Sequence, residues 1–311
     1  MMRIGIPKGL LYSKYHPFFE NFFFGLGADI INSENTNKRI LNLGVKHCVD
    51  EACLPVKIYH GHVASIKDQC DFLVIPRIMQ IHNYEYICPK FCGLPEMIMH
   101  SIPNIPPVTL EPLYMHSNKS LYKWCLSVGS MITENKRKIR DAFEHAITAQ
   151  NSFRTGINNP NNKITVMLAG HPYILNDSYI NMNIIKKLND KGIGIITEEF
   201  APSPLADSQV KKLIVKPFWT FCRNLYGAAT AFYQESKING IIYLSSFACG
   251  IDSVVVDLIR LNTGDFPMLV IKLDEHTGEA GVDTRLEAFI DMLERRMQKN
   301  IATFSSHSTV I

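Results

Sequence analysis

The stretch GIIYLSSFACGIDS, residues 240–253, joins the two patterns that decide the fold. Its first part, Gly240 to Ser245, is a short apolar run typical of a strand buried on both faces. Gly250 then relaxes the turn into a helix expected from Asp252 to Leu261. A buried strand that leads directly into a helix indicates a parallel α/β sheet, with Cys249 at the strand-to-helix turn.

The same alternation of strand and helix continues on both sides of this stretch. Residues 151–162 (NSFRTGINNPNN) interrupt it with turn formers, which predicts a linker. We expect an α/β protein with two doubly wound, parallel-sheet domains of the Rossmann or flavodoxin kind, at 1–150 and 163–299, with a cleft between them. A polar tail is expected at 300–311. Further strands are predicted at 4–7, 28–32, 71–76, 163–168, 194–197 and 268–273, and helices at 16–26, 38–50, 55–68, 121–150, 179–191, 223–235 and 284–298.

Composition limits the classes of function. The 32 Lys and Arg residues nearly balance the 29 Asp and Glu residues, so the chain lacks the basic field that binds nucleic acid without sequence preference. The N-terminal residues turn at once into a strand pattern, and no apolar run reaches the ~18 residues of a membrane span. We therefore expect a cytoplasmic protein whose eight cysteines are reduced rather than paired in disulfides.

Three cysteines share an unusual setting. Cys53 and Cys88 stand just before prolines, and Cys249 follows the strand described above, so each is predicted at a helix start. The free amides and the dipole of a helix N-terminus stabilise a thiolate, which is the form that binds metals. Three thiols in such turns predict a metal site, although each one alone is more often incidental. Cys92 is either a further ligand or a packing residue, whereas the cysteines interpreted as structural are Cys48, Cys70, Cys125 and Cys222.

Other polar residues also lie where ligands bind in open α/β sheets, beyond the carboxyl ends of the strands. His171 is in a loop after a predicted strand, where an ordinary capped turn is the simpler interpretation. The run 274–276 (DEH) combines acid and imidazole groups. Such a run is equally typical of residues that support a site and of a solvated acidic loop. His60 and His62 do not share a helix face, so a hydrogen-bonding role is favoured over a metal pair. No phosphate-binding glycine motif is present, so any ATP dependence would belong to a partner.

Six segments together resemble a known family. The sequence is similar to the acyl-CoA dehydratase activase-related proteins, a CoA enzyme activase domain of unknown function related to 2-hydroxyacyl-CoA dehydratase subunits. The resemblance covers nearly the whole chain. The segments that carry it are RIGIPKGLLY (3–12), VDEACLPVKIYHGH (49–62), YICPKFCGLPEM (86–97), LAGHPYILND (168–177), SSFACGIDS (245–253) and LDEHTGEAGVDTRLEAFIDML (273–293).

The resemblance implies a cofactor and a partner. In the related dehydratase subunits, cysteines from separate α/β lobes bind a [4Fe-4S] cluster and leave one iron open to another ligand. By motif position these cysteines are Cys53, Cys88 and Cys249, while Cys92 stands where an apolar residue is expected. An ATPase of the actin-like class drives an electron onto the related enzymes. This chain lacks such a portion, so the resemblance implies an activator ATPase in trans and an acyl-CoA as a possible substrate.

The preferred interpretation is an iron–sulfur protein that takes part in ATPase-driven, low-potential electron transfer or in reductase or dehydratase chemistry. One alternative is a non-catalytic accessory or scaffold protein for an activator ATPase. Another is a metal-free protein that binds a small molecule, and zinc is an alternative metal. The residues expected to support the site are Lys57, His60, Cys92, His171, Asp274, Glu275 and His276.

Overall fold

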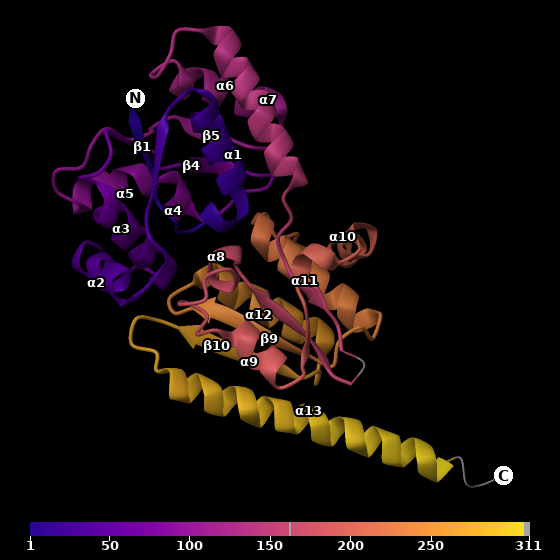
Figure 1. The fold of residues 1–311 in the computed structure, drawn as a ribbon. Coiled ribbons are helices and arrows are strands. Elements are labelled where there is room, and N and C mark those ends of the chain that lie inside the picture. The colour runs from indigo at the N-terminus through magenta and orange to yellow at the C-terminus, as the bar shows by residue number, and fades with distance from the viewer. Residues whose placement is uncertain (162, 308–311) are drawn as a thin grey trace.

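The structure is a computed structural model that describes residues 1–161 and 163–307. It is a mixed α/β fold whose two halves face each other (Figure 1). In the N-terminal half, β1 (Arg3–Ile6) is the central strand of a parallel sheet in the order β2-β1-β3, with β2 at Asp29–Asn32 and β3 at Phe72–Leu73. A second parallel pair is formed by β4 (Arg77–Gln80) and β5 (Pro112–Tyr114).

An aromatic cluster packs the first helix of this half against the helix that carries Trp124. Phe18, Phe22 and Phe23 of the first helix are buried, and their rings pack on one another and toward Trp124. Burying such large apolar side chains stabilises the half by about 2–3 kcal/mol each. The helices of this half are α1 (Tyr12–Gly25), α2 (Lys38–Lys46), α3 (Leu54–Ile66), α4 (Pro89–Cys92), α5 (Leu94–Ser101), α6 (Asn118–Gly129) and α7 (Lys136–Ser152).

The C-terminal half contains a larger sheet in the order β10-β9-β7-β8-β6. Four of its strands are parallel: β7 (Thr165–Gly170), β8 (Gly194–Ile196), β9 (Gly240–Ser246) and β10 (Met268–Leu273). Only β6 (Asn158–Asn159) runs antiparallel, at the edge. The parallel strands all end at one side of the sheet, which is where the loops that carry polar residues gather.

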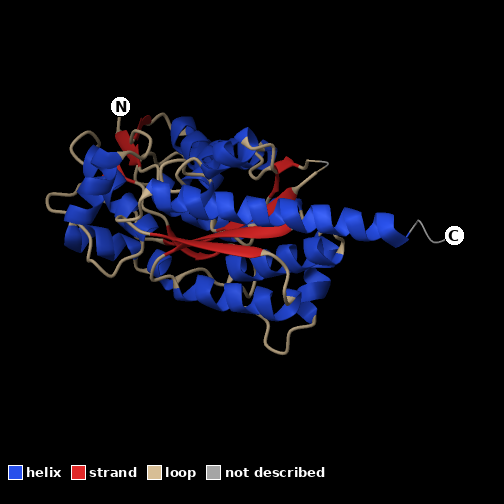
Figure 2. Cartoon of the chain, turned by 90° about the horizontal axis from the view of Figure 1, so that it is seen from below, coloured by secondary structure: helices blue, strands red, loops and turns tan. Residues whose placement is uncertain are grey.

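Helices pack on both faces of this larger sheet, as Figure 2 shows. Successive side chains of β7 alternate between the faces, so that Leu168 joins one buried cluster and Met167 the other. The first face is covered by α8 (Pro172–Leu175), α9 (Ile184–Asp190) and α13 (Glu279–His307). The second is covered by α10 (Ser203–Lys211), α11 (Thr220–Gln234) and α12 (Gly250–Thr263), with a short turn of helix, η1 (Glu198–Phe200), at its edge.

The parallel α/β class predicted from the sequence is confirmed, and the predicted apolar strands are present. The strands β4, β5 and β6 were not predicted, because each is short and carries proline or polar residues. The single helical segment predicted at 121–150 is two helices, α6 and α7, because Asn135 caps a new helix through its side chain. The last helix, α13, continues to His307 into the predicted tail, and residues 308–311 lie outside the described residues.

The two halves share buried cores. Ile40 of α2 and Ile58 of α3 belong to the cluster that packs on the C-terminal sheet, whereas Phe221 of α11 belongs to the cluster of the N-terminal half. The division into two doubly wound domains therefore stays a prediction, with boundaries at 150 and 163. The shared packing fixes the loops of one half against those of the other.

The contact between α2 and α3 depends on two glycines. A Cβ atom at Gly44 would lie 1.9 Å from the carbonyl oxygen of Lys57, and one at Gly61 would lie 1.9 Å from that of Ile40. We expect Gly44→Ala to lower the free energy of unfolding by about 3 kcal/mol, because the two backbones must separate. Urea unfolding of the metal-free protein measures this. The control is Gly281→Ala in α13, where a Cβ meets open space and alanine is neutral or mildly stabilising; equal effects of the two variants would contradict the packing argument.

Candidate metal centre

Four helices begin with a potential metal ligand. Cys53 is the N-cap of α3, Cys88 of α4, His171 of α8 and Cys249 of α12. Proline or glycine follows within two residues of each, which allows the turn from an extended cap residue into the helix. The turn before Cys249 also uses Ala248 in a left-handed conformation, with φ of +62°. Such a backbone costs a non-glycine residue about 1–2 kcal/mol, so the neighbouring packing must hold this turn in place.

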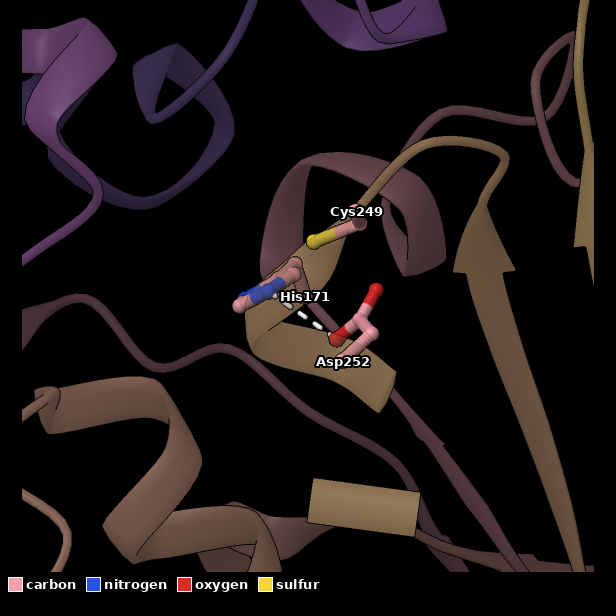
Figure 3. A group of neighbouring side chains, drawn as sticks. All are labelled: His171, Cys249 and Asp252. Atoms are coloured by element: carbon pink, nitrogen blue, oxygen red, sulfur yellow. Dashed lines mark ion pairs between the residues drawn. The ribbon is translucent and has the colours of Figure 1, made fainter. Parts of the chain in front are cut away.

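One tight group of potential ligands is formed by His171, Cys249 and Asp252 (Figure 3). One ligand atom from each residue lies within 4.8 Å of the others. His171 Nε2 is 3.1 Å from Asp252 Oδ1, and the two side chains are only 3% and 1% exposed. The group joins the carboxyl ends of β7 and β9, the place where ligands bind in open α/β sheets.

The Asp252 carboxylate is firmly held. Tyr243 donates a hydrogen bond to its Oδ1 at 2.7 Å, and Ser245 donates one to its Oδ2 at 2.9 Å. Burial by itself raises the pKa of Asp252, but the charge of His171 and these hydrogen bonds outweigh burial and hold this pKa below its usual value. Burial conversely lowers the pKa of His171, yet Asp252 and Cys249 raise it well above the usual range. The pair is therefore an imidazolium and a carboxylate in the metal-free protein.

The three predicted thiols lie near enough for Cys53 and Cys249 to affect the pKa of Cys88. Burial raises the pKa of Cys88, and the neighbouring thiols of Cys53 and Cys249 raise it further. The Tyr173 hydroxyl is buried beside the same groups, and its pKa is raised well above 10 by burial and then by Asp252 and all three cysteines. Lys90 Nζ donates a hydrogen bond to the Cys53 sulfur at 3.5 Å. All three cysteines are half-buried and unpaired.

The expected supporting residues divide into two sets. Lys57 forms a buried ion pair with Glu275 across the two halves and also donates to the Asp50 carbonyl at 2.8 Å. Among the other candidates, His60 and Asp274 bond within their own segments. His60 contacts the Val56 carbonyl, Cys92 the Ile78 carbonyl, and Asp274 accepts from Thr277 in a capped turn, while the His276 side chain is 87% exposed.

His62 has the hydrogen-bonding role predicted for it. Its ring nitrogens lie 2.9 Å from Ser33 Oγ and 3.0 Å from Thr36 Oγ1. Thr36 in turn donates to the Asp177 carboxylate in the other half, so this network ties the halves together beside the site. Burial lowers the pKa of His62 to about 4, which keeps the ring neutral at physiological pH.

Three residues of this region were not predicted. Asp252 lies in the quoted stretch, three residues after Cys249, and an acid in the first turn of a helix resembles an ordinary dipole partner. Tyr173 follows His171 in a segment where an aromatic residue indicates packing. Glu198, in η1, had no signal in the sequence, because only the fold brings it near His171 and Lys14.

Glu198 makes the stability of the protein dependent on pH. Its Oε2 atom is inaccessible to solvent and has no hydrogen-bond partner among the described residues. Burial raises its pKa from 4.5 to about 7, although Lys14 opposes the shift. Because the pKa of Glu198 is higher in the folded state, this residue does not destabilise the fold below pH 4.5, and the free energy of unfolding falls as the pH rises through 7.

We expect Glu198→Gln to raise the free energy of unfolding by about 2 kcal/mol at pH 8 and by little at pH 4. Urea unfolding at both pH values tests this, and equal gains at the two would contradict it.

The fold and this group of side chains define an α/β protein with a candidate metal-binding group of histidine, cysteine and aspartate. Residues 3–200 match the family described as CoA enzyme activase uncharacterised domain, and the chain belongs to this family. The resemblance drawn from the sequence is thereby confirmed. The match includes Cys53, Cys88 and His171, whereas Cys249 and Asp252 follow it. No curated protein matches the chain. None of the helices in the described part of the chain is both long and apolar enough to cross a membrane.

Proposed function

We propose that this protein binds a [4Fe-4S] cluster through Cys53, Cys88 and Cys249 and takes part in low-potential electron transfer. The observation that carries the proposal is that three unpaired thiols, from helix starts far apart in the sequence, lie near one another and near the half-buried Tyr173. A packed core does not require thiols in these turns, whereas an iron–sulfur cluster requires them together with neighbouring hydrogen-bond donors.

The residues around the thiols fit such a group. Within the described chain, Nδ1 of buried His171 has no hydrogen-bond partner, while Nε2 faces Asp252 at 3.1 Å, so Nδ1 is a candidate ligand atom. Lys90 offsets negative charge at Cys53. The aromatic rings of Tyr173 and Phe91 pack on each other there, with centroids 6.1 Å apart. When bound, the cluster supplies one-electron chemistry at low potential.

The proposed electron donor and reaction are inferences from the family. A protein of a CoA enzyme activase family without a phosphate-binding glycine motif needs its ATP hydrolysed elsewhere, so we propose an actin-like activator ATPase in trans as the partner. An acyl-CoA is the proposed substrate class. The cytoplasm is the proposed compartment, because it keeps thiols reduced. A purely accessory role remains the second candidate, and a cluster that ATPase and acyl-CoA leave redox-inert would favour that role.

Anaerobic purification tests the cofactor. We expect a brown protein with about four irons and four acid-labile sulfides per chain, and an EPR signal after reduction with dithionite. Elemental analysis of the same sample measures zinc. A colourless, iron-free protein after reconstitution with iron and sulfide would refute the proposal. One equivalent of tightly bound zinc would instead identify the site as a zinc site.

A further inference from the structure

His171 is a buried polar residue beside Cys249, one of the three thiols. Its side chain is 3% exposed, and its Nδ1 atom has no hydrogen-bond partner within the described residues, whereas Nε2 faces Asp252 Oδ1 at 3.1 Å. A buried polar group without a partner costs about 1–3 kcal/mol. A residue with only a packing role would not require this cost, whereas a ligand atom bound to the ring would remove it.

Neighbouring rings hold the imidazole in one orientation. Tyr173 stacks on it with centroids 5.0 Å apart and planes inclined by 19°. Phe221 meets it edge-on at 5.5 Å. Both contacts restrict rotation of the ring, so its two nitrogens point in fixed directions. A metal ligand held in this way needs little reordering on binding.

Asp252 is placed to support the imidazole rather than to bind a metal itself. Its two oxygens already accept hydrogen bonds from Tyr243 and Ser245, and Oδ1 also faces His171 Nε2 at 3.1 Å. Histidines that bind metals usually direct their other nitrogen to such a carboxylate. The carboxylate would therefore fix the ring at Nε2 and leave Nδ1 to the metal.

The imidazole is also next to one of the proposed cluster ligands. A nitrogen of His171 and the sulfur of Cys249 lie within 4.8 Å of each other, and Figure 3 shows the two side chains adjacent. Three cysteines leave one iron of a [4Fe-4S] cluster without a protein ligand. We propose that His171 is the fourth protein ligand, bound to that iron, and that Asp252 is its positioning residue. This inference rests on the proposed cluster.

The test is pulsed EPR of the anaerobically reduced full chain, labelled with ¹⁵N-histidine. We expect a strong ¹⁵N hyperfine coupling that His171→Ala abolishes while at least three quarters of the iron and sulfide remain, as the three cysteines still bind. His60→Gln is the control, since the His60 ring is buried but bonded to a backbone carbonyl, and it should retain the coupling. External imidazole added to His171→Gly should restore the coupling.

A second variant guards against a fold defect. His171→Cys keeps a ligand at this position, so we expect it to bind a full cluster without the ¹⁵N coupling and at a lower reduction potential, because thiolate adds negative charge. Coupling that persists in His171→Ala, or that is absent from the iron-loaded wild type, would overturn the inference and leave the cluster intact. A wild-type chain that binds no iron after reconstitution would instead refute the proposed function, and this inference with it.

Discussion

Serine in place of Cys53, Cys88 or Cys249 is expected to lower bound iron from about four atoms per chain to less than about one. Serine preserves the size and the cap position of the side chain but removes the thiolate, which is the ligand that iron–sulfur clusters need. The loss should be similar for all three positions, since each thiol would bind a different iron. Iron and sulfide content, together with the absorption spectrum after anaerobic reconstitution, measures the effect.

Cys92→Ser is the matched control for this series. Cys92 is half-buried like the three thiols and lies one turn from Cys88, but its sulfur faces the Ile78 carbonyl at 3.9 Å. We expect this variant to keep its full iron content. The metal-free forms of all four variants should unfold within about 0.5 kcal/mol of the wild type, because half-buried Cys-to-Ser changes disturb little packing. If any of the three ligand variants keeps its iron, that cysteine is not a ligand. If Cys92→Ser loses its iron, Cys92 is a ligand.

The sequence was sufficient to predict the longer apolar strands and where thiols lie relative to helices. Both follow from local physics: apolar runs such as 240–245 bury both faces of a strand, and proline after Cys53 or Cys88 starts a helix. Local patterns did not show that α2 and α3 pack on the C-terminal sheet, since their apolar residues fit either half equally well. The break between α6 and α7 depended on one capping side chain, Asn135.

The site was predictable only in part, for a similar reason. A cysteine at a helix start is recognisable from the sequence as a potential metal ligand, whereas the roles of Asp252 and Glu198 depend on neighbours that are distant in the sequence. His171 was interpreted as a support or an ordinary cap, because its burial and the missing hydrogen bond at Nδ1 are properties of the fold. Two residues of the acidic loop at 274–276 have different roles. Asp274 caps a turn, while Glu275 pairs with a lysine 218 residues away.

The ion pair between Lys57 and Glu275 leads to the second large effect. Lys57 is 2% exposed and Glu275 is 17% exposed, so removal of the carboxylate leaves an almost fully buried ammonium group. We expect Glu275→Ala to lower the free energy of unfolding of the metal-free protein by about 3–4 kcal/mol. The control is Glu287→Ala, whose exposed partner is Lys191 and whose loss should cost at most about 1 kcal/mol. Urea unfolding at pH 7 compares the two.

Two further measurements identify the cause of that loss. Burial raises the pKa of Glu275, but the hydrogen bond and charge of Lys57 outweigh burial and hold this pKa below 4.5. The contribution of the pair is therefore full above pH 4.5 and disappears as the pH falls through the lower, folded value, so wild type and Glu275→Ala should converge in acid. In addition, Lys57→Met should recover most of the stability lost in Glu275→Ala, because no unpaired charge is then buried. A double variant as unstable as Glu275→Ala would show that the carboxylate acts through loop packing and not through its charge.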